Sequence, residues 1–127
     1  MIDQDLVAYL AALGTAASTR VYLGNAIQDK EFPLIVVRRT GGSQPKVLGG
    51  APLFERSEFS VNVFADNYSD AYPIENTIRD ELKNYIGGLG STTIVSSKCT
   101  LFPIDQSEIE GDKVTRWVAL NFLFMHS

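Results

Sequence analysis

The chain has 127 residues, of which 45% are hydrophobic and 20% are charged, values typical of a single soluble globular domain. A chain of this length buries roughly 68% of the surface that its unfolded form exposes, so it needs neither a disulfide nor a structural metal. The excess of acidic over basic residues gives a net charge of −4, the wrong sign for gripping nucleic acid through its phosphates.

Cysteine and histidine content excludes further classes. The single cysteine, Cys99, rules out an internal disulfide, and with His126 as the only histidine a Cys/His zinc framework cannot be assembled. No apolar run approaches the roughly 20 residues that span a bilayer, and the N-terminus is acidic where a signal peptide is basic. The sequence therefore predicts a cytosolic protein with no membrane partner, no metal and no cofactor.

The first third of the chain predicts one helix and two strands. Leu6, Tyr9, Leu10 and Leu13 recur at helical spacing behind Asp3, which we expect to be the N-cap, and Gly14 ends the stripe. Residues 20–23 read as a short strand. Residues 34–40 predict a strand whose first, apolar and β-branched part is covered on both faces and which reaches solvent at Arg38 and Arg39.

Residues 41–52 are rich in Gly and Pro and exceed the two to five residues usual in a hairpin connection. We expect this loop to be flexible and to make functional contacts. The strand predicted next, over residues 53–65, alternates with Phe59, Val61 and Val63 on one face and polar residues on the other. One side is therefore predicted to be buried.

A second helix is predicted from a cap at Asn67 or Ser69 to Gly87, with Pro73 near its first turn. Its predicted buried stripe consists of Ala71, Ile74, Ile78, Leu82, Tyr85 and Ile86. A strand over residues 92–102 is predicted to close at Pro103.

An acidic connection then turns at Gly111 and leads into a last strand over residues 114–125. Apolar residues on both faces of this strand indicate a central position, or an exposed side that meets another subunit.

The order of elements is thus helix, three strands, helix, two strands. This order predicts an α+β domain spanning residues 1–127, with a mostly antiparallel sheet of four to five strands and two helices packed on one face.

Few residues suggest catalysis. His126 is penultimate, where chains usually fray, and Cys99 lies in an apolar strand pattern where cysteine acts as a small hydrophobe. Asp105, Glu108, Glu110 and Asp112 could form an acid/base pair or hold a divalent ion, but their spacing is more typical of a solvated turn. The glycine pairs at 41–42, 49–50 and 87–88 lack the strand-to-helix order of a phosphate loop. We therefore expect no enzyme, and a small enzyme or ligand-binding domain is the alternative of another class.

Two features suggest contact with partners. Arg38 and Arg39 together form a small basic patch or a solvated strand end. Trp117 stands one position out of phase with the alternating apolar residues that follow it, which favours an interface anchor.

Several segments in one order resemble a known family. They are an Ile-Asp-x-x-Leu-Val-Ala-Tyr-Leu helix at 2–10, Arg-Val-Tyr-x-Gly at 20–24, Phe-Pro-Leu-Ile-Val-Val-Arg-Arg at 32–39, Phe-Ser-Val-Asn-Val-Phe-Ala at 59–65, Asn-Tyr-Ser-Asp-Ala at 67–71 and Trp-Val-Ala-Leu-Asn-Phe-Leu-Phe at 117–124. Over nearly the whole chain, this order resembles the tail completion, or tail terminator, proteins of long-tailed (siphovirus-type) bacteriophages and prophages.

The resemblance implies a structural virion protein that forms a hexameric ring on the head-proximal end of the tail tube. Such a ring stops tail polymerisation and provides the head-docking surface. The implied partners are further copies of the chain, the major tail tube protein and the head-completion or neck protein, with DNA only passing through the bore. The implied location is the tail of the virion, after assembly in the host bacterial cytoplasm. The alternative is a neck or head-closure protein of the same assembly.

Under this reading, the candidate assembly contacts are Gln44, Pro45, Lys46, Val47 and Leu48 in the loop, together with Arg38, Arg39 and Trp117. We expect the loop to become ordered on the tail tube or on a neighbouring subunit. Asp105, Glu108, Glu110 and Asp112 are candidates for an acidic bore that lets DNA slide.

Overall fold

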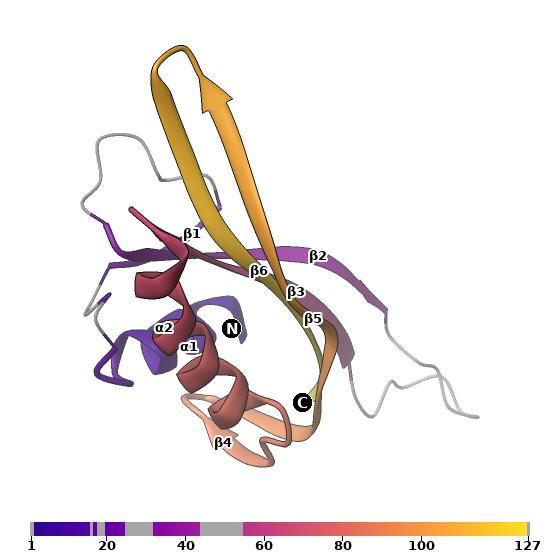
Figure 1. Cartoon of the computed structure of the whole chain (residues 1–127). Coiled ribbons are helices and arrows are strands. Elements are labelled where there is room, and N and C mark those ends of the chain that lie inside the picture. Colours follow the sequence, from indigo (N-terminus) through magenta and orange to yellow (C-terminus); the bar gives the residue numbers. More distant parts are fainter. Residues whose placement is uncertain (1, 16, 18–19, 25–31, 44–54, 127) are drawn as a thin grey trace, which may run out of the picture.

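The computed structural model describes residues 2–15, 17, 20–24, 32–43 and 55–126, which form two helices and six strands (Figure 1). In chain order the elements are α1 (Ile2–Ala11), β1 (Val21–Leu23), β2 (Leu34–Ser43), β3 (Glu55–Ala65), α2 (Tyr68–Leu82), β4 (Gly87–Leu89), β5 (Thr92–Glu110) and β6 (Lys113–His126).

All six strands join one curved sheet in the order β1-β2-β3-β6-β5-β4 (Figure 1). The short β1 runs parallel to β2, and each other pair of neighbours is antiparallel. At the centre, β3 and β6 pair from Glu55 opposite His126 to Ala65 opposite Arg116. The last strand thus takes the central position that its two apolar faces indicated.

The expected mostly antiparallel sheet of four to five strands is wrong, because six described strands form a mixed sheet with both parallel and antiparallel pairs. The parallel pair is β1 with β2, which places Val21 opposite Ile35 and Leu23 opposite Val37. The segment predicted to be a helix cap and turn contains β4. Gly87 and Gly88 have no side chains, so this strand shows no alternation in the sequence.

The core lies between one face of the sheet and the two helices, which pack on the same side (Figure 1). The inward residues of β3 lie beside those of β6 on the face that the helices cover. Each fully buried Phe or Leu stabilises the fold by about 1.5–3 kcal/mol. All four residues 34–37 of β2 are also buried, which confirms a strand covered on both faces. The central buried residues are Leu6, Leu10, Ile35, Val37, Phe59, Val61, Val63, Ile74, Ile78, Leu82, Val118, Leu120, Phe122 and Phe124.

Both helices differ in detail from the prediction. Asp3 lies inside the first turn of α1, so it is not the N-cap. Asn67 caps α2 by accepting a hydrogen bond from the backbone N–H of Asp70 at 2.9 Å. This helix ends at Leu82, and Ile86, the last residue of the predicted stripe, is 74% exposed. Tyr85 lies beyond the helix but still packs against the core, with its ring edge-on to Tyr9.

The largest departure is β5, which does not close at Pro103 but continues to Glu110. The register with β6 shifts between Leu101 and Ile104, and proline is tolerated where a ladder is interrupted in this way. The acidic connection expected after residue 102 is therefore strand. It forms a long hairpin with β6 that turns at Gly111, whose φ is 62°.

The turn between β4 and β5 yields the first prediction. Gly90 has a φ of +57°, and a Cβ added there would lie 2.7 Å from the Asp5 Cγ of α1. We expect Gly90→Ala to lower the free energy of unfolding by about 1–3 kcal/mol, measured by urea denaturation, because both the backbone and the Asp5 contact become strained.

Gly88→Ala is the matched control, since a Cβ at Gly88 meets no atom within 4 Å and its φ is not in the left-handed region. Equal effects of the two substitutions would contradict the prediction.

Candidate functional site

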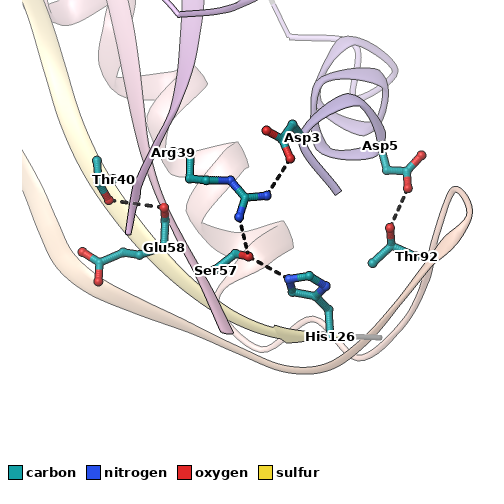
Figure 2. Close-up of polar contacts among 8 residues, drawn as sticks. All are labelled: Asp3, Asp5, Arg39, Thr40, Ser57, Glu58, Thr92 and His126. Carbon is teal, nitrogen blue, oxygen red and sulfur yellow. Dashed lines mark hydrogen bonds and ion pairs between the residues drawn. The ribbon is translucent and has the colours of Figure 1, made fainter. Parts of the chain in front are cut away.

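A chain of polar contacts, here called the polar cluster, joins Asp3, Arg39, Ser57 and His126 at one end of the sheet (Figure 2). Arg39 donates hydrogen bonds to Asp3 Oδ1 at 2.7 Å and to Ser57 Oγ at 3.2 Å. The Ser57 Oγ and His126 Nε2 atoms are 2.8 Å apart and hydrogen-bonded. The cluster therefore connects α1, β2, β3 and β6.

Arg39, Ser57 and His126 meet because they occupy inward positions of their strands, and Asp3 reaches Arg39 from the first turn of α1. Ser57 is two residues from the buried Phe59, and His126 is two residues from the buried Phe124. The Arg39 guanidinium also points to this side, with its carbon 5.2 Å from the centre of the Phe59 ring. The sequence held one signal of this cluster: Ser57 and His126 are polar residues at positions where the alternation of their strands predicts a buried side chain.

The contact between Ser57 and His126 has the length of a nucleophile–base hydrogen bond. However, Ser57 is 1% exposed and His126 is 2% exposed, so in this conformation the Ser57 hydroxyl is closed to a substrate. The expectation that the chain frays at His126 is wrong, because this residue pairs with both β3 and β5 and is buried. The hydrogen bond between Ser57 and His126 joins the start of β3 to the end of β6.

A second set of contacts extends this end of the molecule. Asp5 of α1 accepts hydrogen bonds from Thr92 Oγ1 at 2.6 Å and from Ser91 Oγ at 3.0 Å. These hydrogen bonds, that from Thr92 foremost, lower the pKa of Asp5. A hollow of about 520 Å³ lies between the two sets of contacts, lined by Ile2, Asp3, Arg39, Glu55, Ser91, Thr92 and His126.

The four acidic candidates lie at the opposite end, on the β5–β6 hairpin. We define the arm as residues 104–116 of this hairpin, and its outer part, from Glu108 to Thr115, extends past the end of β3 and projects beyond the rest of the sheet (Figure 1). Asp105, Glu108, Glu110 and Asp112 are all exposed along it. The arm also exposes apolar side chains, since Ile109 is 74% exposed and the Val114 opposite it is 38% exposed.

The base of the arm is held by α2. The Tyr72 hydroxyl donates a hydrogen bond to Asp105 Oδ2 at 2.7 Å, and this contact raises the pKa of Tyr72. Tyr68 donates to the carbonyl of Gln106 at 2.8 Å. Beside them, Glu75 is buried and pairs with Arg79 at 3.1 Å, and burial raises the pKa of the Glu75 carboxyl.

Trp117 lies on the sheet face that is turned away from both helices, here called the open face. Its ring stacks on Phe64 with centres 5.3 Å apart, and Phe64 stacks in turn on Phe32. Leu34 and Val36 complete this smaller apolar cluster. The rest of the open face includes Arg38, Arg56, Glu58, Ser60, Asn62, Ser96, Lys98, Ile104, Gln106, Ala119, Asn121, Leu123 and Met125.

Arg38 and Arg39 do not form one basic patch. Successive side chains of a strand point to opposite faces, so Arg38 lies opposite Ser60 on the open face while Arg39 joins the polar cluster. Residues 41–43, predicted to begin the loop at 41–52, are instead the end of β2, and residues 44–52 lie outside the described part of the chain. The candidate contacts Gln44, Pro45, Lys46, Val47 and Leu48 lie outside the described residues.

The described part of the chain offers neither a metal cluster nor a membrane-spanning helix. Within it, the acidic, histidine and cysteine side chains form no group of three that could hold a metal ion. Neither described helix is long and apolar enough to cross a membrane.

Comparisons with known proteins place the fold. No family model matches the sequence, and no curated protein matches it significantly. Among solved structures, the chain is similar to a chain from the virion of a native gene transfer agent (GTA) particle, with a TM-score of 0.67 and 18% sequence identity. The match covers 99% of this chain and 92% of that chain, so the two share a fold over nearly their whole lengths.

The polar cluster predicts a specific loss of stability. We expect Ser57→Ala to lower the free energy of unfolding by about 1–3 kcal/mol, because His126 and Arg39 each lose a hydrogen bond at a buried hydroxyl. Ser60→Ala, at a half-buried position on the open face of the same strand, is the control: it removes the hydrogen bond that Asn62 Nδ2 donates at 2.9 Å outside the core and should cost less than Ser57→Ala. Urea denaturation of both variants tests this, and a harmless Ser57→Ala would contradict it.

The same cluster predicts a pH dependence. The hydrogen bond from Arg39 lowers the pKa of Asp3, so the folded state is favoured while this carboxyl is ionised. This contribution is complete above the ordinary pKa of Asp, near 3.9, and is lost as the pH falls through the lower folded value. Because the pair is partly exposed, we expect it to amount to less than about 1 kcal/mol.

The test compares the stability of the wild-type chain and of Asp3→Asn between about pH 5 and pH 2. The variant should lose less stability over this interval than the wild type does, and the exposed Asp66→Asn serves as the control. Identical pH profiles for the wild type and Asp3→Asn would refute the assignment.

Proposed function

We propose that this chain is a structural virion protein that forms a ring on the head-proximal end of a phage tail tube. The ring ends tail polymerisation and provides the surface onto which the head docks. Each copy of the chain would contact further copies, the major tail tube protein below and the head-completion or neck protein above. The protein would reside in the virion after assembly in the host cytoplasm.

The observation that carries this proposal is the shared fold with a chain of the gene transfer agent virion over nearly the full length of both chains. The order of segments in the sequence supports the same class, because it resembles tail terminator proteins from the first helix to the last strand. Fold alone does not fix function, so the surfaces must also suit assembly.

The described surfaces suit a subunit that meets neighbours on several sides. The arm exposes Ile109 and Val114 away from the core, and the open face carries the half-buried Leu123 and Met125. Exposed apolar residues grouped on a rigid framework are typical of protein–protein contacts. The Ser57 hydroxyl, in contrast, is closed to solvent, which supports a structural role over a hydrolytic one.

Charge also suits a channel for DNA. Each copy carries a net charge of −4, so a ring of copies would be strongly acidic. A bore with this charge repels the phosphates of DNA and would let the duplex slide without being held.

Electron microscopy of particles assembled without this gene tests the proposal. Loss of a terminator should give overlong tails, because nothing stops the addition of tube subunits, and the wild-type gene supplied in trans should restore normal length. Tails of normal length without heads would instead identify a neck or head-closure protein. Normal particles would exclude both roles.

A further inference from the structure

We infer that the base of the arm is a proton-sensitive contact: a proton on Glu75 tightens the hold of α2 on β5, and loss of that proton loosens it. The arm would then change its attachment to the rest of the domain with pH. The inference concerns a single copy of the chain, so it does not depend on the function proposed above.

Three side chains of α2 form a row beside the base of the arm. Tyr68, Tyr72 and Glu75 are spaced four and three residues apart, so they lie on one side of the helix. The two tyrosine rings stack with centres 6.2 Å apart, and their hydroxyls donate to the Gln106 carbonyl and to Asp105. Glu75 continues this row by one helical turn, and its carboxyl lies close enough to Asp105 for the two charges to interact.

Glu75 is the one buried acidic residue in the described part of the chain. It is 5% exposed, whereas the other acidic residues of α2, Asp70, Asp80 and Glu81, are exposed. Its Oε1 atom lies 3.1 Å from Arg79 Nε, and this ion pair is not aligned as a hydrogen bond. A buried carboxylate that lacks hydrogen bonds is costly, and protonation removes much of that cost.

Burial and two of the three neighbouring charges oppose ionisation of Glu75. Burial is the largest influence and raises the pKa of its carboxyl, Arg79 lowers it, and Asp80 and Asp105 raise it again. The net effect is a pKa above the ordinary value of Glu, which is about 4.3. Glu75 therefore keeps its proton to a higher pH than an exposed glutamate does.

The other elements beside α2 supply apolar groups and polar groups that are already bonded. Arg116 of β6 donates to the carbonyl of Asp66 at 3.2 Å, just before the helix. From α1, Tyr9 donates to Glu81 at 2.9 Å. The inward residues that β3 and β6 bring to this part of the core are Val61, Val63, Val118 and Leu120.

Ionisation of Glu75 acts against the contact beside it. The Tyr72 hydroxyl donates to Asp105 at 2.7 Å, and this hydrogen bond keeps Asp105 close to α2. A negative charge on Glu75 repels Asp105, and the buried carboxylate gains hydration when α2 and β5 separate. Tyr72 and Asp105 are both exposed, so water can replace their hydrogen bond at little cost. The contact between α2 and the arm is therefore the part that yields.

The direction of the pH effect follows from linkage. The closed contact raises the proton affinity of Glu75, so the proton in turn favours the closed contact. This contribution is complete below the ordinary pKa of Glu and is lost as the pH rises through the raised value of the closed form. The Tyr72 hydroxyl stays protonated over this interval, because its hydrogen bond to Asp105 raises its pKa. The arm should thus be held more tightly at acid pH than at neutral pH.

Nuclear magnetic resonance of the full chain measures both parts of the inference. The carbon resonance of the Glu75 carboxyl reports its titration between about pH 4 and pH 8. Hydrogen exchange of the amides of residues 104–107 and of their partners 116–119, corrected for the intrinsic effect of pH, reports the attachment of the arm. We expect protection of these amides to fall by about threefold or more as the pH rises, with the midpoint at which Glu75 titrates.

Glu75→Gln keeps the size of the side chain and removes its charge. Protection at the base of the arm should therefore lose its pH dependence and remain at the level that the wild type shows at acid pH. Glu108→Gln is the matched control, because it makes the same change at an exposed acidic residue of the outer arm. This control should keep the pH dependence of the wild type.

Asp105→Asn provides a second test that leaves Glu75 in place. It removes the repulsion and retains an oxygen to which Tyr72 can donate. The midpoint of the Glu75 titration should move to lower pH, and the change in protection at the base of the arm should move with it and become smaller.

Protection that is constant between about pH 5 and pH 8, or that rises with pH, would overturn the inference. Different midpoints for Glu75 and the base of the arm would also overturn it, as would a folded Glu75→Gln variant with the pH dependence of the wild type. If Glu75→Gln does not fold, the wild-type titration and Asp105→Asn decide the question. All of these measurements use the purified chain, so their failure leaves the proposed virion role standing, and failure of that role leaves them valid.

Discussion

The pairing of β3 with β6 is the contact on which the other parts of the molecule depend. It places Phe59 opposite Phe122 and Val61 opposite Leu120, so the apolar residues of both central strands face the helices together. A slip of one residue would turn this set toward solvent, which makes the register strongly specified. In the same register Ala65, the last residue of β3, lies opposite Arg116 of β6. Residues 113–115 of β6 therefore pair with β5 alone, in the outer part of the arm.

The two ends of this central pair have opposite character. At one end, β3 and β6 close with Ser57 bonded to His126, and Arg39 ties them to Asp3 of α1. Buried polar groups are tolerated there because they satisfy one another. At the other end the hairpin extends past β3, and hydrogen bonds from Tyr68 and Tyr72 of α2 and from Arg116 to the Asp66 carbonyl hold its base. Polar contacts thus join several elements at one end, whereas the other end projects from the sheet.

The two ends therefore differ in how much of the chain packs around them. The core and the polar cluster connect the central strands to the helices, so the arm extends from strands that are themselves packed against the helices. The same fold occurs in a chain from the virion of a gene transfer agent particle, over nearly the full length of both chains.

Alternating apolar residues in the sequence determined which side chains of residues 59–65 and 118–124 enter the core, because side chains of a strand alternate by geometry. The parallel pairing of β1, the continuation of β5 past Pro103 and the position of His126 were decided only by the tertiary structure. Each depends on which strand lies alongside, and this is settled by contacts between residues far apart in the chain. Local pattern specifies the buried face of an element, whereas its neighbour, its length and the partners of its polar groups follow from the packing of the whole sheet.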